Sequence, residues 1–412
     1  MKLRCAALAT AVSLTSFVAI VAADVYVRDL TKPNGAGPFF QIRRGAKWGF
    51  MDVTGKTTIQ PSYDDEGHFF NGLARVRVER HWGFINEAGV MVIPPRFEDA
   101  GDFRGTLAPV RVGKKWGYID QKGRILVAPA FQGAAAFREG LARVEMWDWI
   151  QCRNSVVYGK EDAPDYVYGI QSDIRHGMNN TCFPLKSRVG YINDTGHFSI
   201  TPRFIEAHDF FDGLAAVRTD LYGKFGFIDR SGAVVIDFQF DEARNFSQGL
   251  AAVRVGRGNG YGIRDLGRCG FIDRTGKFII RAQFAEAGNF SEGLAPVSFW
   301  DRDGRGYIDK SGRLVIAAQY TWTEPFSEGL AQVCHQVRPT FMRCEYIDNR
   351  AKVIIDSVQA FGPFSGGLAI AHQINESNEP TGPSVYIDKS GHVVAPAEIE
   401  NPPSIRPNLR QP

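Results

Sequence analysis

The sequence predicts an all-β protein built as a tandem array of antiparallel repeats of about 34 residues. A Trp-Gly-aromatic tripeptide begins at Trp48, Trp82 and Trp116, with a constant spacing of 34 residues. Next to each tripeptide, apolar and polar residues alternate as they do in half-buried strands. Between successive copies lies a second submotif, a Phe followed four residues later by Leu-Ala, as at Phe103 and Leu107. A fixed period of this length is typical of repeat architectures.

The tripeptide pattern continues to the C-terminal part of the chain without its tryptophan. Its first position is occupied in the later copies by Val189, Phe225, Cys269, Arg305, Cys344 and Ser384, which brings the number of copies to nine. A side chain that stacks on a ligand in every repeat would not be replaced by Val or Cys, whereas a packing position could be. We therefore interpret Trp48, Trp82 and Trp116 as core residues.

These linked copies closely resemble the WG-repeat (KWG-repeat) family, over about residues 39 to 397. The resemblance implies a repeat scaffold and no particular activity, because the family is defined by the repeat. The predicted organisation is given by residue ranges: signal peptide 1–23, partial repeat or cap 24–47, repeats 48–146, insertion 147–187, repeats 188–397 and disordered Pro-rich tail 398–412.

The segment from Ala108 to Asp120 predicts a β-hairpin. Gly113-Lys114 is suited to a two-residue turn, and this register places Gly117 opposite Val110 and Arg111 opposite Trp116, where a cation–π contact could form. The hairpin ends in Asp-x-x-Gly (Asp120 to Gly123), a turn in which Asp accepts backbone hydrogen bonds and Gly tolerates a positive φ. A third strand should follow from Arg124 to Val127.

One repeat is thus expected to contain about three short strands. Both faces of its hairpin carry apolar residues, so each unit needs neighbours on both sides. We expect a continuous stack, elongated or superhelical and solenoid-like. A closed β-propeller is the alternative, and its weakness is that 34 residues is short for a four-stranded blade.

The first 23 residues have the features of a secretory signal peptide. Lys2 and Arg4 precede an apolar run, and Val21-Ala22-Ala23 supplies the small residues of a cleavage site before Asp24. An uncleaved anchor is the alternative, because the run nearly reaches spanning length. We predict a secreted or periplasmic protein with no membrane span after cleavage. Removing the two leader charges from the formal net charge of +3 leaves +1, which does not favour nucleic acid.

Large insertions all fall in one hairpin loop of the repeat, and equivalent loops of stacked repeats lie side by side. The longest insertion, 147–187, is rich in aromatic residues that suit a binding surface. The predicted binding loop comprises Trp147, Trp149, Tyr158, Tyr166 and Tyr168. A self-packing cap and a decayed repeat are the alternatives for this insertion.

Export makes disulfide bonds plausible. Cys152 and Cys182 fall in the same insertion and are predicted to pair. Cys334 and Cys344 flank a short hairpin and should sit opposite each other on neighbouring strands, within reach of a disulfide. Cys269 is left over and is interpreted as a buried free thiol.

The sequence indicates no catalytic, metal or cofactor site. The tripeptide Asp194-Thr195-Gly196 occurs in aspartic proteases, but here it coincides with the repeated turn, and the required second copy is missing. The His residues show no metal-ligand spacing. We therefore expect a non-enzymatic exported scaffold that binds a protein or envelope component through its loop-bearing edge. A glycan- or cell-wall-polymer-binding module is the alternative, followed by a hydrolase. Ligand, organism and oligomeric state stay open.

Overall fold

The computed structural model describes residues 38–147, 151–152, 155–156, 187–257, 266–301, 304–338, 341–375 and 380–397. These residues form nine antiparallel sheets of three or four strands and a two-stranded pair, and they contain no helix that could span a membrane. The predicted signal peptide and tail, residues 24–37 and most of the 147–187 insertion lie outside the described ranges.

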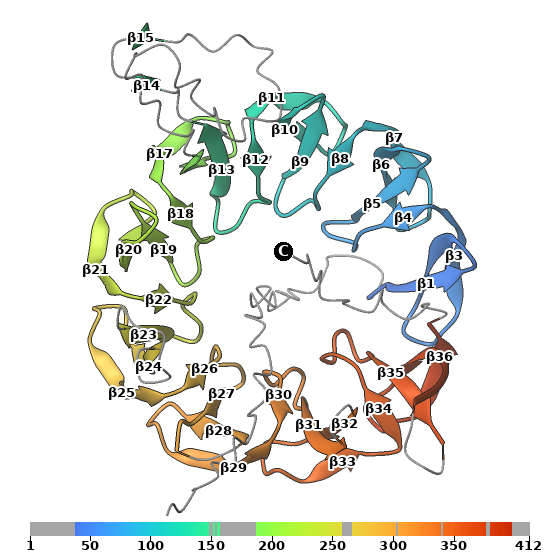
Figure 1. Cartoon of the computed structure of the whole chain (residues 1–412). Helices are drawn as coiled ribbons and strands as arrows, with labels where there is room; N and C mark the ends of the chain where they lie inside the picture. The colour runs from blue at the N-terminus through green and yellow to red at the C-terminus, as the bar shows by residue number, and fades with distance from the viewer. Residues whose placement is uncertain are drawn as a thin grey trace, which may run out of the picture. The chain divides into compact units, whose positions relative to one another are not determined.

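We number the nine sheets as blades 1 to 9 in chain order (Figure 1). Blade 1 contains β1 (Phe40–Arg44), β2 (Lys47–Met51) and β3 (Thr57–Tyr63). Blade 2 contains β4 (Asp65–Glu66), β5 (Leu73–Val78), β6 (His81–Asn86) and β7 (Met91–Phe97). Blade 3 contains β8 (Asp99–Ala100), β9 (Leu107–Val112), β10 (Lys115–Asp120) and β11 (Ile125–Phe131). Blade 4 contains β12 (Gly133–Ala134), β13 (Ala142–Trp147), β16 (Ser187–Ile192) and β17 (Phe198–Phe204), and the separate pair is β14 (Gln151–Cys152) with β15 (Ser155–Val156).

The remaining blades repeat the four-strand pattern. Blade 5 contains β18 (Glu206–Ala207), β19 (Leu214–Arg218), β20 (Phe225–Asp229) and β21 (Val234–Phe240). Blade 6 contains β22 (Glu242–Ala243), β23 (Ala251–Arg257), β24 (Leu266–Ile272) and β25 (Phe278–Phe284). Blade 7 contains β26 (Glu286–Ala287), β27 (Leu294–Ser298), β28 (Arg305–Asp309) and β29 (Leu314–Tyr320). Blade 8 contains β30 (Trp322–Thr323), β31 (Ala331–Arg338), β32 (Phe341–Ile347) and β33 (Val353–Ile355). Blade 9 contains β34 (Val358–Ala360), β35 (Ala369–Ile374), β36 (Pro380–Ile387) and β37 (Val393–Pro396).

The hairpin of blade 3 confirms the predicted register. Gly117 lies opposite Val110 and Trp116 lies opposite Arg111. A Cβ on Gly117 would lie 2.4 Å from the carbonyl oxygen of Val127 on β11, so only glycine lets the outer strand approach this closely. In the predicted turn, the Oδ1 atom of Asp120 accepts hydrogen bonds from backbone amides two and four residues later.

The cation–π contact predicted for Arg111 and Trp116 is not formed in blade 3, but the equivalent pairs of the first two blades form it. The guanidinium carbon of Arg43 lies 5.4 Å from the ring centroid of Trp48, and that of Arg77 lies 5.8 Å from Trp82. In blade 3 the Arg111 guanidinium lies 3.7 Å from the Asp99 carboxylate. Trp82 is buried as predicted, whereas Trp48 and Trp116 are half-buried, and Trp116 packs against the edge of a core cluster.

Each blade from 2 to 9 contains one strand more than the predicted three. In blade 3 the additional strand is β8, only two residues long, which pairs with β9. Two residues are too short to show an alternating pattern, and for this reason the sequence did not reveal the strand. Figure 1 shows these short first strands towards the centre of a ring and the fourth strands at its circumference.

Consecutive blades pack face to face through apolar side chains and one repeated hydrogen bond. Phe84 of blade 2 and Phe103 of the blade 3 inner loop form an edge-to-face pair with centroids 4.9 Å apart. In blade 3 the Tyr118 hydroxyl donates a hydrogen bond of 2.8 Å to the Ala135 carbonyl in the next blade. Tyr191, Tyr307 and Tyr346 make the same contact with the blade that follows each of them.

The last blade makes these contacts with the first. The Tyr386 hydroxyl donates a hydrogen bond of 2.8 Å to the Gln41 carbonyl, 345 residues earlier in the chain. Phe40 and Ile42 share a buried cluster with Tyr386 and Ala397. The ring is therefore closed, and the fold is a nine-bladed β-propeller. The predicted open, solenoid-like array is wrong. Two-residue inner strands let a 34-residue repeat supply four strands, and the two end blades cover faces that an open stack would expose to water.

Candidate binding face

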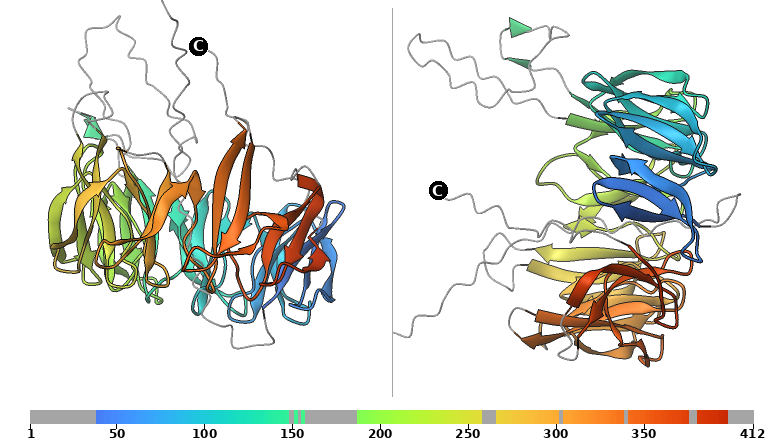
Figure 2. Two further views of the ribbon diagram at one scale, coloured as in Figure 1. Left: turned by 90° about the horizontal axis from the view of Figure 1, so that it is seen from below. Right: turned by 90° about the vertical axis from the view of Figure 1, so that its right-hand side faces the viewer.

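In blades 2 to 9 the described ends of the second and third strands that face their connecting hairpin lie at one end of the ring, because these blades share one strand order; β1 and β2 are the equivalent strands of blade 1. We call this end the loop face. Figure 2 shows the β14–β15 pair and the long β31–β32 hairpin projecting from the same side of the ring. The described parts of these hairpins therefore lie at one end of a ring, and not along one edge of a stack.

The described tips of the loop face carry large, exposed apolar side chains. In blade 5 Tyr222 is 94% exposed, and its neighbour Leu221 is also exposed. Trp300 lies in the tip region of blade 7, and Val337 and Met342 project from the hairpin of blade 8. Several such side chains on one face of a molecule are typical of a protein-binding surface.

Ion pairs join the inner strand to the second strand in blades 2, 3, 5 and 6. Carboxylate and guanidinium groups pair in four blades: Asp65–Arg77, Asp99–Arg111, Glu206–Arg218 and Glu242–Arg254. A hydrogen bond with His208 is the largest cause of the lowered pKa of Glu206, burial acts in the opposite direction, and Arg218 adds to the lowering. These partly exposed pairs contribute little stability, but they give the inner part of the loop face a polar surface of both signs.

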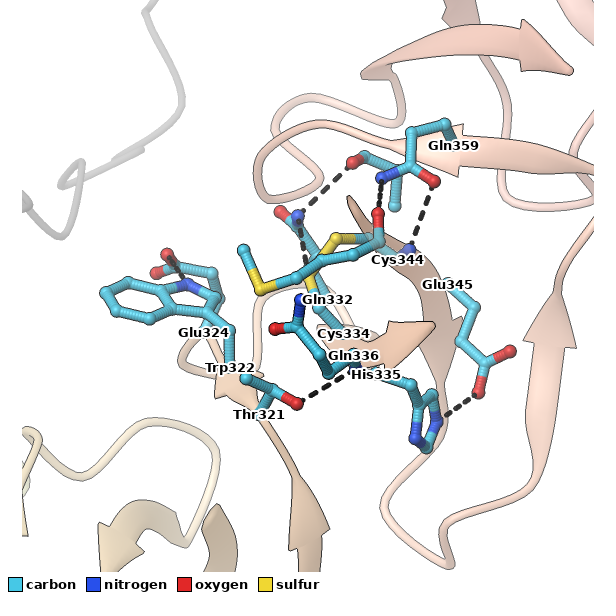
Figure 3. Close-up of a disulfide and its surroundings, with 12 residues drawn as sticks. Thr321, Trp322, Glu324, Gln332, Cys334, His335, Gln336, Cys344, Glu345 and Gln359 are labelled. Carbon is cyan, nitrogen blue, oxygen red and sulfur yellow. Dashed lines mark hydrogen bonds and ion pairs between the residues drawn. A yellow bond between two sulfur atoms is a disulfide. The ribbon is translucent and has the colours of Figure 1, made fainter. Parts of the chain in front are cut away.

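The hairpin of blade 8 is anchored by a disulfide and by hydrogen bonds with neighbouring side chains (Figure 3). The predicted disulfide joins Cys334 on β31 to Cys344 on β32, directly opposite each other, with Cα atoms 4.0 Å apart. The outer strand β33 pairs only with Tyr346 and Ile347. Above it, the side-chain amide of Gln359 donates to the Met342 carbonyl at 3.0 Å and accepts from the Cys344 amide at 3.1 Å. One side chain therefore makes the two backbone contacts that a longer outer strand would make.

Polar contacts fix the same hairpin to its surroundings. The ring centroids of His335 and Tyr320 lie 5.0 Å apart, and the Nε2 atom of His335 lies 3.3 Å from the Glu345 carboxylate. The backbone amide of Gln336 donates a hydrogen bond to the hydroxyl of Thr321, which precedes the inner strand β30. Val337 and Met342 are thus carried on a cross-linked support, which lowers the entropy lost when they bind a partner.

Seven segments of the chain match the family described as WG containing repeat: residues 48–79, 82–116, 116–146, 190–223, 225–258, 270–299 and 306–335. Together they cover more than half of the 412 residues. The chain belongs to this family.

The WG-repeat ring is similar to solved structures at low sequence identity. A crystal structure of the eukaryotic initiation factor matches with a TM-score of 0.53 and 10% identity, covering 87% of this chain and 95% of that one. An acylaminoacyl peptidase from Pyrococcus horikoshii matches with a TM-score of 0.35 and 11% identity, covering 84% of this chain and 59% of that one. A search of curated proteins found no match. At such identities the first likeness supports the fold alone.

The predicted aromatic loop of this WG-repeat protein lies almost wholly outside the described residues. Trp147 ends β13, but its side chain is not among those described. The other predicted site residues outside the described side chains are Trp149, Tyr158, Tyr166, Tyr168, Cys152 and Cys182. These residues stay predictions.

Sequence reasoning missed the exposed residues of the shorter tips. From Val217 to Phe225 and from Val297 to Arg305 there are eight positions, compared with six from Val110 to Trp116. These two-residue extensions were the available signal, and they coincide with the tips that expose Tyr222 and Trp300.

Three sequence interpretations of chemistry can be compared with the described residues. Asp194-Thr195-Gly196 lies in the repeated turn, where the Asn193 Oδ1 atom accepts hydrogen bonds from the backbone of Thr195 and His197. Within the described ranges, no group of three His, Cys, Asp or Glu side chains is arranged to hold a metal ion. Cys269 is a buried free thiol, and burial is the main cause that raises its pKa to about 11.

Proposed function

We propose that this WG-repeat propeller is a non-enzymatic, exported scaffold that binds a partner protein through its loop face. The observation that carries the proposal is the concentration of exposed Tyr222, Trp300, Val337 and Met342 on hairpin tips of one end of the ring. Aromatic residues and Met are enriched in the cores of protein interfaces, and Trp and Tyr supply much of the binding energy there.

Export is the second part of the proposal. The leader-like segment 1–23 supports it, and the Cys334–Cys344 disulfide is compatible with an oxidising compartment. Expression of the full chain in a bacterial host, followed by fractionation and N-terminal sequencing, should find a protein beginning at Asp24 outside the cytoplasm. A cytoplasmic chain that keeps residues 1–23 would contradict this part.

Partner binding is tested by affinity capture from an envelope extract, with identification and a direct titration of the captured protein. The loop-face variant carries Tyr222→Ser, Trp300→Ser and Val337→Ser, and should bind at least about ten-fold more weakly, equivalent to about 1.4 kcal/mol. The matched control carries Val235→Ser, Ile279→Ser and Val315→Ser, similarly exposed positions on outer strands. Equal loss in both variants, or binding only to peptidoglycan or polysaccharide, would overturn the proposal.

The predicted aromatic insertion can be tested separately. Trp147 and Ser187 lie opposite each other on β13 and β16, so a two-residue turn can replace residues 148–186 without changing the register. If the insertion contributes to the binding surface, this deletion weakens capture of the same partner. Unchanged affinity would limit the interface to the described tips.

A further inference from the structure

A groove with a volume of about 560 Å³ lies between blades 2 and 3. It is formed by the end of β7 in blade 2 and, in blade 3, by the end of β9, the β10–β11 turn and the first residue of β11. Three of its side chains are basic and three are apolar: Arg96, Lys122 and Arg124, and Phe97, Val112 and Ile125. Sites of this size commonly hold small organic ligands. The groove therefore offers positive charge and apolar surface to one ligand.

The apolar residues of this groove are partly open to solvent. Phe97 is buried, whereas Val112 and Ile125 are 40% and 47% exposed. Covering such side chains with an apolar ligand is favourable, because it removes hydrocarbon surface from water. An anion without an apolar part would leave this contribution unused.

Arg96 is held in place by contacts with both blades. Its Nη2 atom donates a hydrogen bond to the Gly123 carbonyl of blade 3, and its guanidinium carbon lies 5.0 Å from the centroid of the Phe97 ring. A Cβ on Gly123 would lie 3.3 Å from the same Nη2 atom, so glycine gives the arginine room to approach. The Gly123 carbonyl occupies one of the five N–H donors of the guanidinium. Because the group is already fixed, it loses less conformational entropy when it binds an anion.

Two carboxylates beside the groove are engaged within the protein. The Oδ1 atom of Asp120 accepts the backbone amides of Lys122 and Arg124, and its Oδ2 atom lies 2.7 Å from the Arg124 guanidinium. The Glu98 carboxylate accepts the Gly113 amide at 2.9 Å. Three positive and two negative side chains leave this region with a charge of +1, and the charged side chains that line the groove itself are the positive ones.

Lys122 occupies a position where most other turns have a hydroxyl group. In these turns a Ser or Thr donates a hydrogen bond to the Asp or Asn that begins the turn: Thr54, Thr195, Ser231, Thr275, Ser311 and Ser390. Blade 3 lacks this hydroxyl, so the stability of the turn does not explain the lysine. Blade 8 also has a basic residue here, Arg350, but the β29 residue equivalent to Arg96 is Gln319.

The boundary between blades 4 and 5 has the same packing without the two basic turn residues. Arg203 donates a hydrogen bond to the Gly232 carbonyl, and its guanidinium carbon lies 5.0 Å from the centroid of the Phe204 ring. The two turn positions carry Ser231 and Ala233 there. The arginine therefore serves packing at both boundaries, whereas the two basic residues of the blade 3 turn are not needed for it.

We propose that the groove between blades 2 and 3 binds a small amphipathic anion, a free carboxylate or phosphate ester that carries an aliphatic chain. The charged oxygens lie against Arg96, Lys122 and Arg124, where hydrogen bonds between ionised groups are strong. The chain covers Val112 and Ile125. This site is separate from the loop-face tips, and the inference stands whether or not the loop face binds a protein.

Calorimetric titration of the full chain tests the proposal with two probes, decanoate and decyl phosphate. At least one of them should bind saturably, with one molecule per chain. Inorganic phosphate and decyl maltoside should bind at least about ten-fold more weakly than that probe, since each lacks one of the two parts of the ligand. Absence of saturable binding, or an affinity matched by inorganic phosphate or by decyl maltoside, would overturn the proposal.

Matched variants locate the bound anion. Lys122→Ser with Arg124→Ala gives the turn the residues found in blade 5, and should weaken binding at least about ten-fold. Lys277→Ala with Arg313→Ala removes the same charge from exposed positions in the turns of blades 6 and 7. This control should change the affinity less than about two-fold, because salt screens distant exposed charges. Thermal unfolding checks that both variants are folded, and equal losses of affinity would mean attraction by net charge alone and refute the site.

The apolar contact has its own pair of variants. Ile125→Ser should weaken binding of the probe, whereas Val234→Ser, at the equivalent and equally exposed position of blade 5, should not. An unchanged affinity after Ile125→Ser would contradict the proposal. So would sedimentation with phosphatidylglycerol vesicles that is lost in the Lys122→Ser, Arg124→Ala variant, because it would assign the groove to a membrane surface instead of a free ligand.

Discussion

Blades 3 and 8 share their interior contacts but differ at the end that forms the loop face. Tyr118 and Tyr346 occupy the same position, both fully buried, and each donates a hydrogen bond to the next blade. Their rings pack on the inner-loop Phe residues of the following blade, at centroid distances of 5.2 and 4.8 Å. The contacts that each of these two blades makes with the blade that follows it are thus equivalent.

Nearer the loop face the two blades diverge. Blade 3 ends in the tight Gly113-Lys114 turn and has a seven-residue outer strand. Blade 8 replaces the Arg111–Trp116 pair by the Cys334–Cys344 disulfide, lengthens its hairpin and shortens its outer strand to three residues. Contacts between blades therefore constrain the residues in the interior. The hairpin and the outer strand at the loop face can differ in length and in side-chain chemistry without altering the ring.

The largest expected effect tests whether the interiors of the two blades are equivalent. Tyr118→Ala and Tyr346→Ala each leave a cavity between blades and a carbonyl without its donor, and each should lower the free energy of unfolding by about 3–5 kcal/mol. Chemical denaturation measures both values. Tyr222→Ala, at an exposed tip, is the control and should stay within about 0.5 kcal/mol of wild type. A large difference between the two core variants would break the equivalence.

Removal of the disulfide measures how much stability it adds to blade 8, where it takes the place of the Arg–Trp pair of blade 3. The variant with Cys334→Ala and Cys344→Ala should lose about 2–3 kcal/mol, because the bond closes a short loop in the unfolded chain. Its thermal unfolding should become insensitive to reductant, whereas the wild-type protein should lose stability when reduced. A wild-type melting temperature unaffected by full reduction would contradict this prediction.

Gln359 tests whether a side chain replaces the missing part of the outer strand. Gln359→Ala removes both bonds to β32 and should cost about 1–2 kcal/mol, with faster exchange of the Cys344 amide. Gln319→Ala, at an exposed position on β29, provides a matched control and should leave that amide unchanged. Unaltered exchange of Cys344 after Gln359→Ala would show that the amide is protected by other means.

A smaller effect concerns the inner strand of blade 2, where Glu66 occupies the position of Ala100 in blade 3. Burial is the main cause that raises the pKa of Glu66 from 4.5 to about 8, the charge of Asp65 adds to the increase, and Arg75 and Arg43 oppose it. Because the folded state binds this proton more tightly than the unfolded state, the contribution of Glu66 to stability falls as pH rises from about 4.5 to 8.

Glu66→Gln should therefore raise the melting temperature relative to wild type at pH 8.5, and the difference should shrink towards pH 5, where Glu66 is protonated in the folded protein. Ala100→Gln, at the equivalent position, provides a control whose difference from wild type should not vary with pH. A Glu66→Gln variant that is less stable than wild type at pH 8.5 would mean that the neighbouring arginines stabilise the carboxylate.

The sequence by itself determined the features that depend on neighbouring residues. Alternation and turn chemistry fixed the Gly113-Lys114 hairpin, the pairing of Gly117 with Val110 and the Asp120 turn, and the short hairpin placed Cys334 opposite Cys344. These features follow from local backbone geometry and from side chains a few residues apart, so they can be read in one repeat at a time.

Only the tertiary structure decided that the array closes, although the nine blades correspond to the nine repeat copies that can be counted in the sequence. Closure depends on the small angle between successive sheets, which is set by how side chains such as Phe103 and Tyr118 pack between them, and this angle has no signature in a single repeat. The contact that reveals it joins Tyr386 to Gln41 across 345 residues. The two-residue inner strands also depend on the ring, because their short backbones are held in place by the second strand of the same blade and the side chains of the previous one.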